Sequence, residues 1–195
     1  MFDKNNLRRW FADDGDNTHI LNHDLTEKSM IIDIGAYKGI WAEKMIAKFN
    51  PYILLFEPVP DFIKILNTKF ANQPKVTIFP YGVHPKPGYK SMSINQDASA
   101  ISELGEQFYF ISPDKLPEAD LLQINIEGAE YDLLDYMITS GIITRMKILQ
   151  VQFHNISPDC AQRHDVIRLK LQELGYREKY CYAFVWECWT RILKN

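Results

Sequence analysis

Short apolar runs alternate with segments of helical periodicity over much of this chain, and this alternation limits the folds open to it. Residues 30–34 and 52–56 are almost wholly apolar and have the length of strands. In the segments that follow them, 40–49 and 60–70, apolar side chains recur at helical spacing. Apolar strands separated by helices are typical of a parallel sheet covered on both faces. The pattern therefore predicts an α/β fold.

The same alternation continues towards the C-terminus. Further strands are predicted over 75–79, 121–126 and 148–153. Helical spacing predicts helices around 133–138 and over 160–174. Residues 81–103 are rich in glycine, proline, serine and asparagine, which favours a hairpin or an irregular excursion there.

The segments 177–183 and 185–193 predict the last two strands. Both hold aromatic and β-branched residues, and the interval between them is too short for a crossover helix, so they should pair as an antiparallel hairpin. We therefore expect a Rossmann-like three-layer sandwich whose mostly parallel, seven-stranded sheet ends in an antiparallel C-terminal hairpin. The 195 residues suit a single domain, with 1–29 as a helical or irregular lead-in.

Aromatic residues gather in this hairpin. They are Tyr180, Tyr182, Phe184, Trp186 and Trp189. Packing within the core and the hairpin is the expected role of most of them. Alternation along a strand should also point some of them outward, where a second copy of the chain could cover them, so a homo-oligomer is a further hypothesis.

Charge and composition narrow the classes of partner. The net charge of −3 provides no strongly basic face, so we expect no nucleic-acid substrate. No apolar run approaches the ~20 residues of a membrane span, and the polar N-terminus lacks the apolar segment of a secretory signal. The 3 cysteines lack a close C-x-x-C pair and fit reduced thiols. We therefore expect a soluble, cytoplasmic protein.

The segment 33–39 joins the first predicted strand to the first helix, and its sequence is Asp-Ile-Gly-Ala-Tyr-Lys-Gly. Ligands of open α/β sheets bind at the carboxyl ends of the strands, where glycine lets the backbone approach them closely. The spacing D-x-G-x-x-x-G differs from the G-x-G-x-x-G that cradles a pyrophosphate. S-adenosylmethionine needs no such cradle, because Asp33 and backbone N–H groups can address its amino group and carboxylate. A tight turn with glycines for packing is the structural alternative.

Glu57 ends the second predicted strand, 22 positions after Gly35. In dinucleotide sites an acidic residue about 20 residues beyond the glycine loop binds the adenosyl ribose. A carboxylate can accept hydrogen bonds from both ribose hydroxyls. Glu57 therefore predicts an adenosyl ligand without choosing between S-adenosylmethionine and NAD, and a solvated acid at a strand end is the alternative.

Three motifs together resemble the FkbM-type methyltransferases, class I enzymes that O-methylate sugars and natural-product hydroxyls. They are the loop Ile32–Gly39, the tripeptide Phe56–Pro58 and the segment Gln123–Glu130. The third is the most specific, because the family pattern after the fourth strand is K-x-D-x-E-G-A-E and its E-G-A-E part is intact here. Gln123 and Asn125 depart from the lysine and the aspartate of that pattern. The resemblance covers roughly residues 30–153.

The resemblance implies S-adenosylmethionine as cofactor and S-adenosylhomocysteine as product. The predicted cofactor-binding residues are Asp33, Gly35, Ala36, Tyr37, Lys38, Gly39, Glu57, Pro58, Tyr81, Gly82, Val83 and Asn125. The resemblance also implies that Asn125 and Glu127 face the methyl-transfer site. Residues 91–102 predict either a flap over the acceptor or a plain surface hairpin.

Methyl transfer to a hydroxyl needs a base for the hydroxyl proton, and the predicted catalytic residues are His154, Glu127 and Asn125. His154 follows the fifth predicted strand, and the ordinary imidazole pKa of about 6.5 suits a base. A structural histidine is the alternative, with Glu127 as the competing base. Glu130 is either functional or a charge favoured by a helix N-terminus. These side chains could also hold Mg²⁺, but asparagine at 125 removes a charge that a hard cation favours, so no metal is expected.

Three functions stay open. The favoured one is an S-adenosylmethionine-dependent O-methyltransferase acting on a hydroxyl of a sugar, a glycan precursor or a small natural product. An NAD-linked Rossmann oxidoreductase would need a dinucleotide loop that the D-x-G-x-x-x-G spacing does not supply. A non-catalytic module that binds S-adenosylmethionine is suggested only by Gln123 and Asn125.

Overall fold

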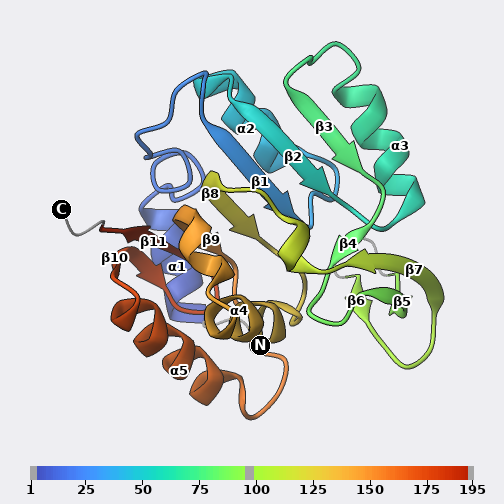
Figure 1. Cartoon of the computed structure of the whole chain (residues 1–195). Coiled ribbons are helices and arrows are strands. Elements are labelled where there is room, and N and C mark those ends of the chain that lie inside the picture. The colour runs from blue at the N-terminus through green and yellow to red at the C-terminus, as the bar shows by residue number, and fades with distance from the viewer. Residues whose placement is uncertain (1–3, 95–98, 193–195) are drawn as a thin grey trace.

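A seven-stranded sheet forms the centre of the molecule (Figure 1). The computed structural model describes residues 4–94 and 99–192. The strand order is β3-β2-β1-β8-β9-β11-β10, and every pairing is parallel except those made by β11. The bounds are β1 Met30–Ile34, β2 Tyr52–Phe56, β3 Val76–Phe79, β8 Ala119–Ile124, β9 Met146–Val151, β10 Tyr176–Tyr182 and β11 Trp186–Arg191. The predicted sheet with its antiparallel C-terminal hairpin is confirmed.

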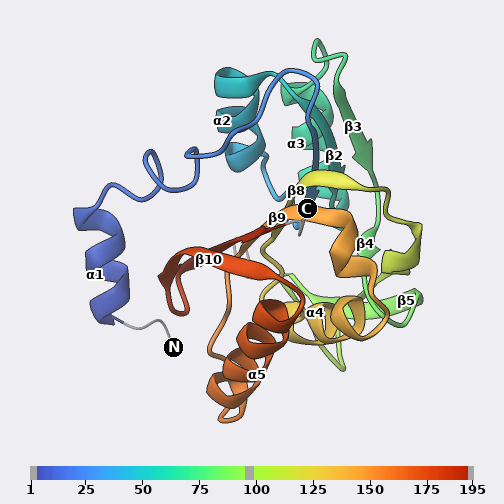
Figure 2. The same ribbon diagram turned by 60° about the vertical axis from the view of Figure 1, so that its left-hand side comes forward.

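Helices cover both faces of this sheet and complete a three-layer sandwich (Figure 2). The helices are α2 Ile40–Phe49, α3 Pro60–Lys69, α4 Glu130–Thr139 and α5 Cys160–Glu173, and short 3-10 turns η1 Pro113–Lys115 and η2 Ile142–Arg145 precede β8 and β9. The α2 and α3 helices pack on one face, and α4 and α5 pack on the other. Within the described ranges, no helix is both long and apolar enough to cross a membrane.

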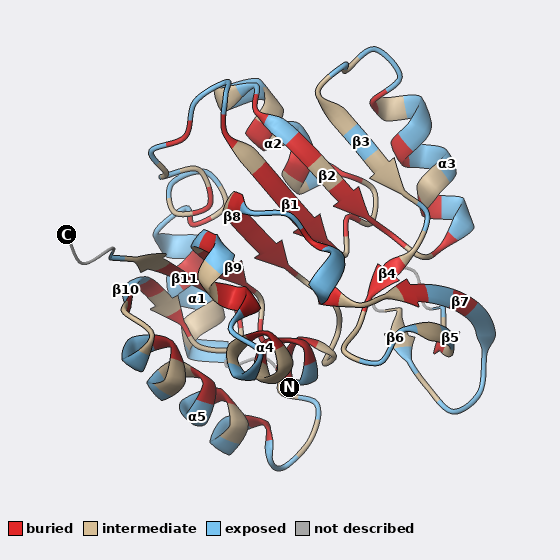
Figure 3. Cartoon of the chain, viewed as in Figure 1, coloured by how far each residue is buried: buried red, intermediate tan, exposed pale blue. Residues whose placement is uncertain are grey.

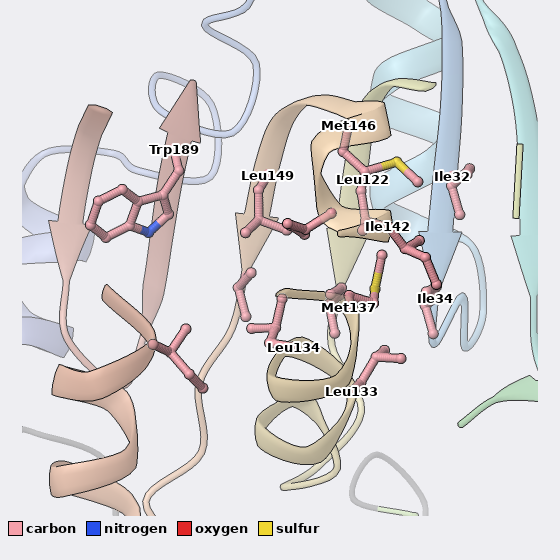
Figure 4. Packing of buried hydrophobic residues seen from close by; sticks show 14 of the residues in the cluster. Ile32, Ile34, Leu122, Leu133, Leu134, Met137, Ile142, Met146, Leu149 and Trp189 are labelled. Carbon is pink, nitrogen blue, oxygen red and sulfur yellow. The ribbon is translucent and has the colours of Figure 1, made fainter. Parts of the chain in front are cut away.

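The central strands β1 and β8 are buried along nearly their whole length (Figure 3). On one face, α4 presents Leu133, Leu134 and Met137 to the sheet, and all three side chains are fully buried (Figure 4). Burial of each such side chain contributes roughly 1.5–3 kcal/mol. Helices on both faces explain why these strands are apolar on both sides.

The strands β8 and β9 end at Ile124 and Val151, two residues before the predicted ends at 126 and 153. The backbone N–H of Asn125 still donates to the carbonyl of Ile34 at 3.0 Å, and the chain then turns away from the sheet. The residues that follow both strands therefore lie in loops at the carboxyl edge of the sheet.

Directly after β3, the chain builds a second sheet, where the sequence predicted only a hairpin or an irregular excursion. Its strands are β4 Gly82–Val83, β5 Gly88–Ser93, β6 Ala100–Ile101 and β7 Glu106–Ile111, in the order β4-β7-β5-β6. β5 and β7 pair as an antiparallel hairpin, but β4 adds to β7 in parallel. Met92, Phe108 and Phe110 form its small core. Residues 95–98 of the predicted flap lie outside the described residues.

The lead-in, residues 4–29, begins with α1 (Lys4–Ala12) and packs against the C-terminal hairpin. The buried Trp10 ring meets the Tyr182 ring edge-on, with 5.2 Å between the centroids. Tyr180 and Trp186 belong to the same apolar cluster. The expectation that outward aromatic residues of the hairpin remain for a second copy is wrong for these three, because the chain covers them with its own N-terminal segment.

Candidate active site

The loop after β1 is shaped by a close approach between two segments of backbone. Gly35 has a φ of +88°, and a Cβ there would lie 2.0 Å from the carbonyl oxygen of Asn125. No other residue type fits this contact without moving one of the two loops. Tyr37 has a φ of +49°, so the loop turns sharply before α2. The glycine loop thus lies directly against the loop that follows β8.

Glu57 ties the glycine loop to the end of β2. Its Oε2 accepts a hydrogen bond from the Tyr37 N–H at 2.9 Å, and its Oε1 accepts one from the Val59 N–H at 2.9 Å. Burial raises the pKa of Glu57 to about 7, although these two N–H donors oppose the shift. Each oxygen still has a lone pair for another donor, because a carboxylate accepts about four hydrogen bonds.

A cavity of about 100 Å³, which we call the Glu57 cavity, is bounded by the glycine loop, the end of β2 and the second sheet. Its lining includes the predicted residues Gly35, Tyr37, Glu57, Pro58, Val83, Asn125 and Glu127. Met92, Ser99 and Ile101 of the predicted flap also line it. Phe62, Ile126 and Ala129 complete the wall. Ile126 and Ala129 belong to the motif segment Gln123–Glu130, whereas no motif in the sequence pointed to Phe62.

A second cavity of about 210 Å³, which we call the Asp33 cavity, adjoins the first. The predicted residues that line it are Asp33, Gly35, Ala36, Tyr37 and Asn125. Further lining residues come from β8, α2, the lead-in and the hairpin, and they are Gln123, Ile40, Trp41, Lys44, Asp16, Ile20 and Trp186. Both cavities share Gly35, Tyr37 and Asn125, so they meet at the glycine loop.

Oxygen atoms without a hydrogen-bond partner are concentrated at the Asp33 cavity. Among the described residues they include both carboxylate oxygens of Asp33, Oε1 of Gln123 and Oδ1 of Asn125. Asp33 and Gln123 are register partners on parallel strands, so their side chains leave the same face of the sheet. Burial, together with the charge of Glu57, raises the pKa of Asp33 to about 8. This wall therefore suits a ligand rich in hydrogen-bond donors, and above all a cation.

Gln150 extends this polar row to β9 and fastens the lead-in to the sheet. It is the register partner of Gln123, and its Nε2 donates to the carbonyl of Ile20 at 3.1 Å. Its Oε1 accepts from the Trp41 indole at 2.9 Å. Beside it, the Lys44 ammonium donates to the carbonyl of Asp16 at 3.1 Å. The N-terminal wall of the Asp33 cavity is thus held by contacts that no local sequence pattern reveals.

His154 lies at the carboxyl edge of the sheet but lines neither cavity. Its Nδ1 is 3.1 Å from Oε1 of Glu130, and its Nε2 is 3.3 Å from Oε1 of Glu127. Burial lowers the pKa of His154, but the hydrogen bonds to the two carboxylates outweigh burial and raise it to about 9. This raised pKa does not favour His154 as the base, and its predicted catalytic role stays a prediction. An imidazole that is already charged at neutral pH accepts no further proton.

Some of the predicted cofactor-binding residues line neither cavity, and these are Lys38, Gly39, Tyr81 and Gly82. The Lys38 ammonium lies over the Tyr37 ring, 4.8 Å from its centroid. The Tyr81 ring packs against Phe79, with 5.6 Å between centroids. These contacts are packing interactions, and a cofactor-binding role for the four residues stays a prediction.

Within residues 4–94 and 99–192, no group of three or more His, Cys, Asp or Glu side chains is placed to hold a metal ion. At the carboxyl edge, both ring nitrogens of His154 face carboxylate oxygens, so neither offers a lone pair to a metal.

Solved structures of similar fold include methyltransferases and a pre-rRNA processing protein. An S-adenosylmethionine-dependent O-methyltransferase from Thermotoga maritima aligns with a TM-score of 0.56 at 12% identity, over 93% of this chain and 66% of that chain. A fibrillarin pre-rRNA processing protein from Methanococcus jannaschii aligns with a TM-score of 0.52 at 10% identity, over 85% and 67%. Fibrillarin from Aeropyrum pernix aligns with a TM-score of 0.51 at 9% identity, over 88% and 70%. At these identities the likeness shows the fold.

No curated protein matches the sequence. A family model does match: the methyltransferase FkbM domain aligns with residues 93–178, which include the E-G-A-E segment and the loop of His154. The FkbM resemblance predicted from the motifs is thereby confirmed over residues 93–178, which hold the third motif, and the chain is a methyltransferase with the fold of the class I enzymes.

Proposed function

We propose that this methyltransferase uses S-adenosylmethionine to methylate a hydroxyl of a sugar, a glycan precursor or a small natural product. The observation that carries the proposal is the meeting of the two cavities at the glycine loop, with Glu57 in one cavity and Asp33 in the other. A ligand with a ribose at one end and an ammonium group at the other matches this arrangement. The Aeropyrum pernix fibrillarin, which shares the fold, was solved with natively bound S-adenosyl-L-methionine.

The polar atoms of the cavities fit this cofactor. The unpartnered oxygens of Asp33, Gln123 and Asn125 would accept hydrogen bonds from its ammonium group. Lys44, which lines the same cavity, would offset the charge of its carboxylate. The free lone pairs of Glu57 would accept hydrogen bonds from the ribose hydroxyls. When bound, the cofactor supplies an electrophilic methyl group on a sulfonium centre.

The same atoms disfavour a nicotinamide dinucleotide. Its pyrophosphate would have to pass the glycine loop, where Asn125 Oδ1 presents an acceptor and the Asp33 carboxyl, once ionised, would repel a phosphate. Phosphate binding at such a loop needs backbone N–H groups or cations. The FkbM match favours methyl transfer for the same site.

Glu127 is the base in this proposal. Its side chain is 25% exposed and lines the Glu57 cavity, whereas His154 lines neither cavity and is charged. A carboxylate at this position can take the hydroxyl proton while the surrounding loops orient the acceptor. Correct positioning of the two reacting atoms supplies much of the acceleration of a methyl transfer. Met92, Ser99 and Ile101 of the flap would contact the acceptor.

We extend the proposal to the organisation of the chain. Residues 1–195 would act as one domain, in which the lead-in contributes Asp16 and Ile20 to the cofactor site. The cysteines Cys160, Cys181 and Cys188 are free thiols, which fits a cytoplasmic enzyme.

Calorimetric titration with S-adenosylhomocysteine tests the cofactor. We expect the wild-type protein to bind it, and Glu57→Gln to weaken binding by about 10- to 100-fold, because each hydrogen bond to a charged group is worth about 1.5–3 kcal/mol. Glu43→Gln is the matched control, since Glu43 is an exposed carboxylate on α2 that pairs with Lys69. A folded wild-type protein that does not bind S-adenosylhomocysteine would contradict the proposal.

Transfer of a labelled methyl group from S-adenosylmethionine to a panel of monosaccharides, sugar nucleotides and phenols tests the acceptor. We expect one class to be labelled, and Glu127→Gln to lower the rate by about 10²- to 10⁴-fold, as loss of a general base does. Binding of S-adenosylhomocysteine by this variant should be unchanged. RNA is offered in parallel, and labelling of RNA without labelling of any member of the panel would contradict a small hydroxyl acceptor.

A further inference from the structure

Glu130, the first residue of α4, is fully buried, and the proposed reaction assigns it no part. Its Oε2 accepts a hydrogen bond from the Gly128 N–H at 2.7 Å. Its Oε1 accepts one from the His154 N–H at 2.7 Å and faces the His154 ring Nδ1 at 3.1 Å. One carboxylate thus binds both the turn that carries Glu127 and the loop that carries His154. A carboxylate that only stabilised the N-terminus of α4 would not need to make these contacts.

The backbone at Glu127 is strained. Glu127 has a φ of +51°, in the left-handed region that few residues other than glycine adopt, and Gly128 follows with a φ of +101°. Such a conformation persists only where the surrounding contacts enforce it. The hydrogen bond from the Gly128 N–H to Glu130 is one such contact, so Glu130 helps to set the direction in which the Glu127 side chain leaves the turn.

The His154 ring lies between two carboxylates, and this geometry determines its protonation. A neutral imidazole has one N–H donor, so one of its nitrogens would have to face a carboxylate oxygen with a lone pair. With Nδ1 directed at the Glu130 carboxylate and Nε2 directed at the Glu127 carboxylate, the doubly protonated ring donates to both. Its positive charge also balances the buried charge of Glu130, which would otherwise be costly.

Other groups around His154 bind its backbone or each other. From α4, the Tyr131 hydroxyl donates to the His154 carbonyl at 2.9 Å. From the start of α5, the Cys160 thiol contacts the Tyr131 hydroxyl. The ion pairs of the ring in the described residues are those with Glu127 and Glu130. The imidazole is therefore fixed in place with its second N–H aimed at the base.

We propose that Glu130 and His154 are positioning residues, a carboxylate–imidazolium pair that holds the Glu127 side chain in place and aimed into the Glu57 cavity. This inference rests on the proposed function, in which Glu127 is the base. His154 then acts through Glu127 and exchanges no proton with the acceptor. The order of the three side chains, from the buried end to the cavity, is Glu130, His154, Glu127.

Nitrogen NMR of ¹⁵N-histidine-labelled protein tests the pair directly, because ring nitrogen shifts distinguish the doubly protonated imidazole from the neutral tautomers. His154→Asn identifies the signals of this residue among the 5 histidines. We expect His154 to be doubly protonated at pH 7 and to titrate near pH 9. Glu127→Gln and Glu130→Gln should each lower this midpoint by about one pH unit or more, since each removes a contacting negative charge.

Asp132→Asn is the matched control for Glu130→Gln. Asp132 lies two residues further along α4, is exposed and pairs with Arg163, so its loss should leave the titration of His154 unchanged. If Glu130→Gln does not fold, the wild-type spectrum and Glu127→Gln still decide the question. A His154 signal that is neutral at pH 7, or a midpoint that Glu127→Gln does not lower, would overturn the inference.

S-adenosylhomocysteine, titrated into the same wild-type sample, separates this inference from the proposed function. If S-adenosylhomocysteine binds and His154 is neutral, the inference about the positioning pair is rejected, but the proposed function is not. A charged His154 in a protein that does not bind S-adenosylhomocysteine would reject the proposed function, and with it the part of the inference that concerns the base.

Discussion

At the scale of single residues, Asp33 is a buried carboxyl whose ionisation depends on whether a ligand is bound. Its carboxyl is buried and has no hydrogen-bond partner among the described residues, and its pKa is raised to about 8. In the FkbM pattern a lysine occupies the adjacent position that Gln123 holds here, so this chain places no cation on β8 beside the carboxyl. The free protein therefore keeps Asp33 protonated at neutral pH, and a bound cation would ionise it.

This arrangement predicts a pH dependence of cofactor binding. Below about pH 8 the free protein must release the Asp33 proton before the carboxylate can pair with the ligand ammonium, so affinity for S-adenosylhomocysteine should rise as the pH increases from 6 to 8. Calorimetry at pH 7 in buffers of different ionisation enthalpy should detect the released proton. Asp33→Asn should bind more weakly and lose most of this pH dependence. Equal affinity at pH 6 and pH 8 in the wild type would contradict this account of Asp33.

At the scale of elements, the lead-in packs against the domain and forms part of the wall of the Asp33 cavity. Trp10 anchors it on the hairpin, and its indole donates to Asp16 Oδ1 at 3.1 Å. Asp16 and Ile20 then line the Asp33 cavity. Packing of the lead-in against the hairpin is thus coupled to the shape of the cavity.

Trp10→Ala tests this coupling. Truncation of a buried tryptophan costs about 3–5 kcal/mol in free energy of unfolding, which denaturant titration measures. Because the lead-in forms part of the cavity wall, the variant should also bind S-adenosylhomocysteine more weakly. Phe11→Ala is the control, since the neighbouring Phe11 side chain is 66% exposed on the same helix. Loss of stability without any loss of affinity would show that the lead-in is not needed for the cofactor site.

At the scale of the whole molecule, a ligand that spans both cavities joins the sheet, the second sheet and the lead-in. It should therefore stabilise the entire fold. At 100 times its dissociation constant, S-adenosylhomocysteine should add about 2.7 kcal/mol, which corresponds to a rise in Tm of about 5–10 °C for a chain of this size. Differential scanning fluorimetry measures the shift. Adenosine, which lacks the amino-acid end, should produce a smaller rise, and a comparable rise with NAD would count against the assignment of the cofactor.

Local sequence patterns were sufficient to predict the seven-stranded sheet and the glycine loop. Strand and helix periods appear over a few residues, and apolar runs on both faces require helices on both sides. The E-G-A-E segment and Glu57 likewise marked two walls of a cavity. The second sheet was missed because β4 and β6 are only two residues long and hold no periodic pattern. Lys44 and Ile20 were missed because their roles depend on where α2 and the lead-in pack.

The sequence alone determined the class of fold, the place of the glycine loop and the resemblance to the FkbM domain, because each of these depends on motifs whose residues are close together in the chain. The tertiary structure decided the charge of His154 and the closure of the Asp33 cavity. His154 is 24 positions from Glu130, and Gln150 is 130 positions from the Ile20 carbonyl that it binds. The pKa of an imidazole and the wall of a cavity depend on which groups lie within a few ångströms, and only folding brings these groups together.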